Sequence, residues 1–568
     1  MLSPEIRRYV LLAALGILGY SLLVTWDRDY GQPDSEEPTA PVDPVGEVER
    51  VDDAPADLAA PEAEVGPVAT DDIPGEDFAA PAAEATAAPE EEETLDAGRL
   101  VRVVTPVLEL WIDRLGGDVV ELRLRQYALS STDPTPVTLF EQGRGHVYIA
   151  QSGLIGRDGR DQSGSRPLYR ASADEYVLEE GRLEVVLRNE QDGVRIDKRF
   201  TFEAEDYLVE VEHEIVNNSV ADFQAQMFVQ LKRDAMRPDS GVPMGPRPYV
   251  GAAFTTPEDR YVKVDFDELD EEPFRAQVDG GWAAILQHYF AATWVGYPGE
   301  VNGYFGRRLN DGNYAVGYVA PPVFVEAGGR ASVASRFYAG PKIQRRLEEL
   351  APHLGLTVDY GFLWFMSVPL FYVLDFLHSW VGNWGVAIIL LTFAVKLLLY
   401  PLASASYRSM AKMKKVMPQM KRLQERHADD RQKLSQEMMA LYKKEGANPL
   451  GGCLPLLVQM PVFLALYWVL LESVELRQAP FVLWIVDLSV KDPWFVLPIL
   501  YAASFWVMQL LQPPPPDPMQ AKIMKTMPLV FGVLFCFFPA GLVLYWLVNN
   551  LLSLAQQWYI TRKIEKAS

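Results

Sequence analysis

The sequence is poor in the residue patterns that build catalytic and metal sites. It has two cysteines, Cys453 and Cys536, which form no Cys-x-x-Cys motif and no disulfide framework. Its six histidines show no metal-ligand spacing, and no phosphate-binding loop, dinucleotide fingerprint or nucleophile-elbow motif occurs. We therefore expect a protein that is not an enzyme and that uses neither a cofactor nor a metal ion.

Carboxylates are absent from five late apolar runs, each of which we predict to be a membrane-spanning helix. A proton-coupled carrier usually places a titratable carboxylate in such segments. A channel or transporter is therefore the least favoured of the three classes of function that we consider. The five runs are Trp384–Leu402, Leu454–Leu471, Trp494–Leu511, Met527–Phe538 and Gly541–Ile560.

Basic residues predict the orientation of these helices. Segment 402–450 carries eleven Lys and Arg against five Asp and Glu, so the positive-inside rule places it in the cytoplasm. An earlier apolar run, Tyr9–Trp26, follows a short N-terminus (1–8) and has no small-residue cleavage site, so we interpret it as an uncleaved anchor. Together with a five-helix core (384–562) and a tail (563–568), it makes six spans with both chain ends in the cytoplasm.

A further apolar stretch, residues 360–378, is long enough to be a seventh span. If it crossed the membrane, the basic segment 402–450 would lie outside, against its charge. Pro369 and Asp375 also argue against a crossing. We predict that residues 341–383 form a connector followed by an interfacial amphipathic helix, rich in aromatic residues, in the outer membrane interface.

Two segments between the anchor and the membrane core differ sharply in composition. Residues 27–98 form an acidic, proline- and alanine-rich spacer that accounts for most of the net charge of −24. We interpret the spacer as disordered, because it cannot bury enough apolar surface to offset its ordering entropy, with an acidic binding tail as the alternative. Residues 99–340 alternate apolar and polar residues in short runs, for example over 208–215, and predict one large all-β sandwich domain outside the cytoplasm.

The basic segment 403–446 has methionines and leucines at helical spacing on both sides of a polar break at 426–431. We predict a cytoplasmic hairpin of two amphipathic helices. Its methionines either pack the two helices together or offer an adaptable apolar surface to partners. The excess of basic residues suits ribosomal RNA or anionic headgroups, so the ribosome and membrane lipids are expected partners.

Lys396 lies inside the first late apolar run, about 8 Å from its cytoplasmic end at 1.5 Å per residue. An ammonium group at the bilayer centre costs roughly 2.5–3.5 kcal/mol, which snorkelling to the headgroups would avoid. Polar residues on the other runs favour a shared hydrated cavity instead. These residues are Thr392, one turn before Lys396, and Gln459, Tyr545, Asn549, Asn550 and Gln556.

Four stretches of the chain resemble the YidC/Oxa/Alb family of membrane protein insertases. They are "YPLASASYRSMAKMKKVMP" (400–418), residues 448–500, "DPMQAKIMKTMP" (517–528) and "FPAGLVLYWLVNNLLSLAQQ" (538–557). The resemblance is strong over 355–562, whereas the anchor and the β domain match the Gram-negative architecture, with its supersandwich-like periplasmic domain, more loosely. It implies a hydrophilic groove that is open to the cytoplasm and to lipid and closed to the periplasm.

The resemblance also implies roles for single residues. Lys396 corresponds to a basic groove residue that is Arg in well-known Gram-negative members. The positive charge is kept, but lysine lacks the planar guanidinium group that can donate two parallel hydrogen bonds to one carboxylate. Tyr545 matches the first of two adjacent tyrosines, and Trp546 replaces the second. The expected substrate-binding groove residues are Lys396, Thr392, Gln459, Tyr545, Met460 and Phe463.

The resemblance implies an insertase of the bacterial inner membrane. Its clients would be nascent membrane proteins, received either by this protein alone or together with the Sec translocon, and a monomer would suffice. The main alternative is a membrane-anchored periplasmic chaperone or glycan-binding protein, whose active part would be the β domain (99–340).

Overall fold

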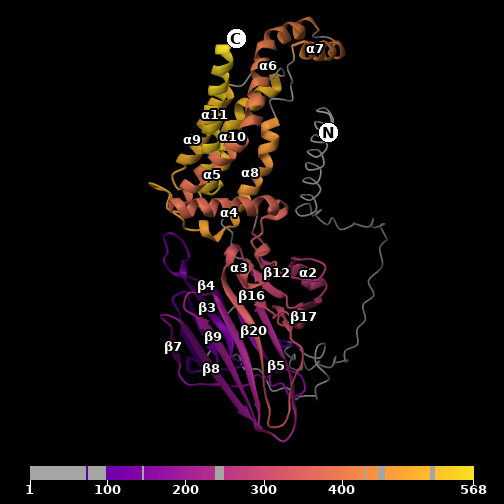
Figure 1. Cartoon of the computed structure of the whole chain (residues 1–568), viewed down its shortest axis with the longest axis vertical. Coiled ribbons are helices and arrows are strands. Elements are labelled where there is room, and N and C mark those ends of the chain that lie inside the picture. Colours follow the sequence, from indigo (N-terminus) through magenta and orange to yellow (C-terminus); the bar gives the residue numbers. More distant parts are fainter. Residues whose placement is uncertain are drawn as a thin grey trace, which may run out of the picture. The chain divides into compact units, whose positions relative to one another are not determined.

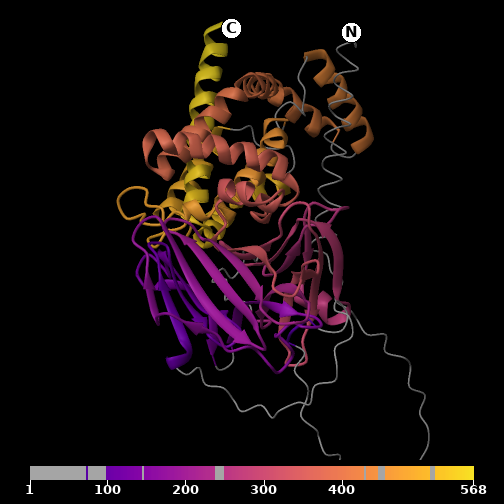
Figure 2. The same cartoon turned by 60° about the horizontal axis from the view of Figure 1, so that its bottom comes forward.

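The computed structural model describes residues 72–74, 97–143, 146–236, 248–427, 430–445, 454–511 and 518–567. The predicted anchor and most of the spacer lie outside these residues. Contacts group residues 67–568 into one compact unit. Within this unit the strands form one domain, and a helical region follows them in the sequence (Figures 1 and 2).

The β domain is built from two sheets, which confirms the predicted large all-β domain. An 11-stranded sheet has the order β14-β17-β18-β11-β5-β4-β3-β2-β1-β7, with β19 beside β11. Its strands are β1 (Leu100–Val104), β2 (Leu108–Asp113), β3 (Asp118–Ala128), β4 (Pro136–Gly143), β5 (His146–Ile155), β7 (Glu175–Val177), β11 (Phe223–Arg233), β14 (Phe274–Asp279), β17 (Val301–Arg308), β18 (Tyr314–Val319) and β19 (Val323–Val325).

A nine-stranded sheet has the order β13-β12-β15-β16-β20-β10-β9-β8-β6. Its strands are β6 (Arg170–Ala171), β8 (Arg182–Gln191), β9 (Val194–Glu203), β10 (Leu208–Asn217), β12 (Gly251–Phe254), β13 (Val262–Val264), β15 (Trp282–Leu286), β16 (Phe290–Val295) and β20 (Arg330–Pro341). A six-residue helix, α2 (Phe266–Glu271), interrupts the strands.

Alternation of side chains explains how the two sheets pack. Every second residue of β10 is buried, as the sequence pattern over 208–215 predicts for a strand with one face in a core. Between the sheets, Phe140 of β4 stacks on Phe337 of β20 with ring centroids 5.8 Å apart, and Trp294 of β16 lies 4.6 Å from the same ring. These large aromatic side chains supply much of the apolar burial that stabilises the sandwich.

The helical region begins at the end of β20. Its helices are α3 (Gln344–Leu350), α4 (Trp364–Val381), α5 (Trp384–Leu398), α6 (Tyr400–Arg426), α7 (Arg431–Glu445), α8 (Leu454–Glu472), α9 (Val496–Leu511), α10 (Pro518–Leu534) and α11 (Ala540–Ala567). In Figure 1, α4 lies across the ends of α5 and α8, which it contacts.

Two helix boundaries differ from the sequence expectation. The run Trp384–Leu402 does not form one straight helix, because α5 ends at Leu398 and α6 continues at an angle of 65°. Pro401 stands in the first turn of α6, where its missing N–H costs nothing, and its ring disfavours continuation of the preceding helix. The run Met527–Phe538 is the end of a longer helix, α10, followed by a single 3-10 turn.

Only one helical segment of the described residues, Gly361–Val381, is by itself long and apolar enough to cross a membrane. The bent pair Trp384–Leu398 and Tyr400–Met410 meets the same criterion as a unit, and shorter apolar helices cover Val458–Glu472 and Val496–Leu510. The number of spans therefore stays a prediction. Gly361–Val381 contains the helix for which we predict an interfacial position.

One flank of α4 is polar and bonded to α3. Arg345 Nη2 donates to Asp375 Oδ2 at 2.7 Å, and the Tyr372 hydroxyl donates to Glu348 Oε2 at 2.6 Å. On other sides of the helix, large apolar residues such as Trp380 are exposed. This division between a bonded polar flank and an exposed apolar surface is typical of a helix that lies at an interface.

A buried charge cluster joins the β domain to the end of α8. Lys342 Nζ lies 3.6 Å from Glu472 Oε2 and donates to the Thr357 carbonyl at 3.2 Å. His288 Nε2 lies 3.0 Å from the Leu471 carbonyl and 3.9 Å from Glu472 Oε1. The two domains therefore share a desolvated polar contact.

We expect the folded protein to lose stability below pH 6.5 through His288. Burial, together with the nearby Lys342 ammonium, lowers the pKa of this imidazole to about 3. Because the unfolded chain binds the proton from about pH 6.5 downward and the folded chain does not, the contribution of His288 to the unfolding free energy should fall by about 2 kcal/mol between pH 7 and pH 5. The change in Tm from pH 7 to pH 5, measured by melting curves, should be more negative for the wild type than for His288→Gln, and an equal change would contradict this assignment.

Candidate functional site

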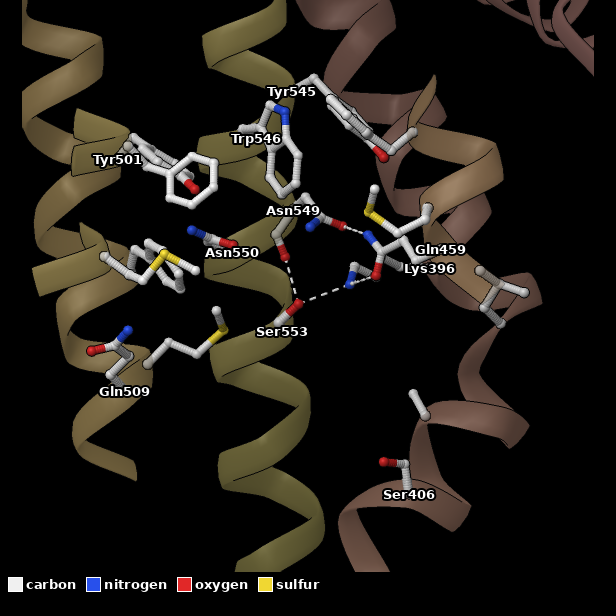
Figure 3. Close-up of a pocket in the computed structure, with 18 of the residues that line it drawn as sticks. Lys396, Ser406, Gln459, Tyr501, Gln509, Tyr545, Trp546, Asn549, Asn550 and Ser553 are labelled. Carbon is white, nitrogen blue, oxygen red and sulfur yellow. Dashed lines mark hydrogen bonds between the residues drawn. The ribbon is translucent and has the colours of Figure 1, made fainter. Parts of the chain in front are cut away.

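A cavity of about 920 Å³ lies among the helices α5, α6, α8, α9, α10 and α11. It is the place where polar side chains from predicted spans meet (Figure 3). Its polar lining consists of Lys396, Ser406, Tyr407, Ser409, Gln459, Tyr467, Tyr501, Gln509, Tyr545, Asn549, Asn550 and Ser553.

Lys396 belongs to the wall of this cavity and is 9% exposed. Its ammonium group donates to Ser553 Oγ of α11 at 2.8 Å and to Gln459 Oε1 of α8 at 3.2 Å. Both partners are neutral, and among the described residues no carboxylate pairs with this ammonium group. The positive charge is thus held in place by hydrogen bonds without being neutralised.

The partners of Lys396 are themselves fixed by hydrogen bonds. Gln459 Nε2 donates to Asn549 Oδ1, which orients the amide so that its oxygen faces the ammonium group. Ser553 Oγ donates to the Asn549 carbonyl at 2.7 Å, so its lone pairs remain available to Lys396. These bonds join α5, α8 and α11, and Figure 3 shows them as one connected set. A positioned network of this kind needs little reorganisation to receive a charged guest.

The remaining walls of the cavity are apolar and rich in flexible or aromatic side chains. The thioether side chain of methionine adapts its shape to different neighbours. Phe463 lies 4.4 Å from the Trp546 ring and stacks on Tyr545 at 6.3 Å. The methionines that line the cavity are Met410, Met413, Met460, Met508, Met524 and Met527.

Comparisons with known proteins identify the family. Residues 376–567 match a family described as "60Kd inner membrane protein", and residues 100–373 match one described as "YidC periplasmic domain". A membrane protein insertase YidC of Pseudomonas putida is 48% identical over 576 residues, with 99% of each chain covered. This chain belongs to the YidC family of membrane protein insertases. The YidC protein of Stutzerimonas stutzeri is also 48% identical, over 565 residues and 99% of each chain.

Solved structures give more distant likenesses. A crystal structure of active YidC insertase with its first transmembrane domain resolved is 19% identical, with a TM-score of 0.37, and covers 81% of this chain and 92% of its own. A galactose mutarotase related enzyme from Lactobacillus acidophilus is 9% identical, with a TM-score of 0.29, and covers 42% of this chain and 97% of its own. Neither likeness, at these scores, bears on function.

Membership of the YidC family decides between the classes of function left open by the sequence. It confirms the prediction of a non-enzymatic inner-membrane insertase with a large periplasmic domain. The periplasmic chaperone or glycan-binding protein and the transporter are therefore set aside.

Five of the six groove residues predicted for this YidC-family chain line the same cavity: Lys396, Gln459, Met460, Phe463 and Tyr545. Thr392 does not line it. The Thr392 side chain is 1% exposed, and its hydroxyl donates to the Ile388 carbonyl of its own helix at 2.6 Å. Helical spacing places Thr392 on the same face of α5 as Lys396. The Thr392 hydroxyl, however, is already satisfied by the backbone carbonyl four residues earlier.

The sequence reasoning did not select Ser553, although this residue gives the shortest hydrogen bond to Lys396. Serine in a membrane helix commonly bonds to its own backbone, so it seldom stands out from the sequence. A usable signal was its position four residues after Asn549, which places both on one face of α11.

Proposed function

We propose that the cavity around Lys396 receives the polar or acidic N-terminal segment of a nascent membrane protein during insertion into the inner membrane. Family membership supports the insertase activity. The observation that carries the proposal is a positively charged side chain, held in a cavity of about 920 Å³, for which no carboxylate of the described chain serves as counter-ion.

The charge lowers the cost of bringing a client carboxylate below the membrane surface. Moving an unpaired charge into an apolar medium is expensive, and a hydrated cavity with polar walls reduces that cost. At an effective dielectric constant of 20, an ammonium group 4 Å from a carboxylate contributes about 4 kcal/mol of attraction. For translocation of the client segment, the membrane potential adds about 2.3 kcal/mol per charge for each 100 mV.

The apolar segment of the client would leave along α8 and α10 into the lipid. Met460 and Phe463 of α8 and Met527 of α10 line the cavity, so an apolar helix would meet side chains that adapt to its shape. The interfacial helix α4 and the short membrane portion of α10 would thin the bilayer along this route.

We further propose six spans with both termini in the cytoplasm, with α6 and α7 forming a cytoplasmic hairpin. Val416 and Met420 of α6 form a small apolar cluster with side chains of α7, and the Tyr442 hydroxyl contacts Met420 Sδ at 3.4 Å. These contacts support the interpretation of the methionines as the seam of the hairpin. The basic residues of the hairpin would contact the ribosome and lipid headgroups, and a monomer would act alone or with the Sec translocon.

Site-specific photocrosslinking tests the groove. A photoreactive residue at Met460 or Phe463 should crosslink to a stalled nascent chain that carries an acidic N-terminal segment. The same residue at Val220, which is fully exposed in the β domain, provides the matched control and should not crosslink. Equal crosslinking from all three positions, or none from the two cavity positions, would contradict the proposal.

A further inference from the structure

The 11-stranded sheet carries apolar side chains on both faces where β5, β11, β18 and β17 lie side by side. Met227 and Val229 of β11 face the sandwich core, whereas the intervening Phe228 belongs to a separate apolar cluster. A sheet face left to solvent would carry polar residues at these positions. Another part of the chain must therefore shield this second apolar cluster from water. Its members in the strands and the adjoining turn are Ile155, Phe228, Phe305, Leu309, Ala315 and Val319.

The side chain that completes this cluster is Ile73 of the acidic spacer. Ile73 is 3% exposed, so the apolar cluster encloses it almost completely. Pro74 follows it, and the backbone bends at Ile73. A bend can place one aliphatic side chain into a pocket while the neighbouring carbonyl groups accept hydrogen bonds from the surrounding protein.

Hydrogen bonds from the sheet hold the backbone of this segment. Gln230 Nε2 donates to the Asp72 carbonyl at 2.5 Å, and Arg307 Nη2 donates to the Ile73 carbonyl at 3.2 Å. Gln230 is fully buried, and the same nitrogen also donates to Gln151 Oε1 at 2.8 Å. The donor for the Asp72 carbonyl is thus fixed in advance by the interior of the β domain.

That interior network extends further from the segment. Gln151 Nε2 donates to Asp118 Oδ2 at 2.8 Å, and the Arg166 guanidinium pairs with the Asp118 carboxylate, also at 2.8 Å. The Arg166 guanidinium in turn lies 5.6 Å from the Phe228 ring of the apolar cluster. Arg166 therefore links the polar network of the pocket to its apolar cluster.

We propose that this pocket is a docking site for the segment Asp72–Pro74 and that it holds the acidic spacer on the β domain as an internal ligand. The ligand class is a short peptide that bends at an aliphatic residue before proline and has two carbonyl groups that accept hydrogen bonds. Docking gives the chain a point of attachment to the β domain at residues 72–74, in addition to the start of β1 at Leu100.

A peptide competition experiment on the full-length protein tests this proposal. The probe is a fluorescent peptide of residues 67–78 with a photoreactive aliphatic residue in place of Ile73. In Ile73→Asp the segment should leave the pocket, because an aspartate cannot be buried there without a partner. The peptide should then bind Ile73→Asp at least about tenfold more tightly than the wild type, since burial of one Ile side chain corresponds to a factor of that order or more. Its crosslinks should map to β11, β17 and β18.

Two control variants separate docking from general effects. Val220→Asp places the same acid on a fully exposed residue of the β domain and should bind the peptide as the wild type does. Ile73→Leu keeps an aliphatic side chain and should also behave as the wild type. Because Ile73 lies outside every strand, its replacement leaves the sheet hydrogen bonds intact. Equal binding by the wild type and Ile73→Asp, binding by neither, or crosslinks elsewhere would overturn the proposal.

Discussion

Lys396→Glu should abolish the insertion of clients that have acidic N-terminal segments, and Lys396→Arg should retain it. In the wild type, the ammonium group attracts a client carboxylate by about 4 kcal/mol at 4 Å and an effective dielectric constant of 20. A glutamate would turn this attraction into a repulsion of similar size. An arginine would keep the charge, although it would change the hydrogen bonds to Gln459 and Ser553.

Depletion of the wild-type protein and complementation with each variant, followed by protease accessibility of a client, measures this effect. We expect at least a tenfold loss of insertion for Lys396→Glu and an intermediate loss for Lys396→Met. Lys491→Glu is the matched control, because Lys491 is exposed and does not line the cavity. A client without acidic residues in its N-terminal segment should be less affected. Normal insertion of the acidic client by Lys396→Glu would contradict the proposed role of the cavity in insertion.

The second large effect should come from the buried pair Lys342–Glu472. Both residues are less than 5% exposed, and their charged atoms lie 3.6 Å apart. Removing one partner leaves an unpaired buried charge, which typically costs 3–5 kcal/mol. Glu472→Gln or Lys342→Met alone should therefore lower the unfolding free energy by about that amount. The double variant should recover most of the loss, because it leaves no unpaired charge.

Denaturant unfolding of the purified protein, followed by tryptophan fluorescence, measures these variants. Asp375→Asn is the matched control. Its partner Arg345 lies closer, at 2.7 Å, but the Arg345 side chain is 62% exposed, so the loss should stay below about 1 kcal/mol. If Asp375→Asn destabilised the protein as much as Glu472→Gln, burial would not be the reason for the effect.

The sequence predicted well those features that depend on near neighbours in the chain. Alternation over 208–215 indicated β10, and the apolar runs indicated the late helices. The boundaries were less exact, since α5 and α6 bend at Leu399 and α10 begins nine residues before the predicted Met527. Capping, proline and packing decide where a helix ends, and hydropathy alone does not contain this information.

The site could be predicted only in part, because its hydrogen bonds depend on how the helices pack together. A lysine within an apolar run is visible in the sequence, and the polar residues of other runs suggested a shared cavity. That Thr392 would satisfy its hydroxyl within its own helix, and that Ser553 would accept from Lys396, depended on helix packing.

The sequence by itself determined the all-β domain, the apolar helices, the basic segments and the family, because each of these is encoded in local patterns or in long motifs. Only the tertiary structure decided which groups surround Lys396, since its partners lie 63 and 157 residues away along the chain. It also decided that Ile73 fills a pocket on the β domain. Local patterns fix the conformation of each segment, whereas contacts between distant segments arise only when the burial of apolar surface brings them together.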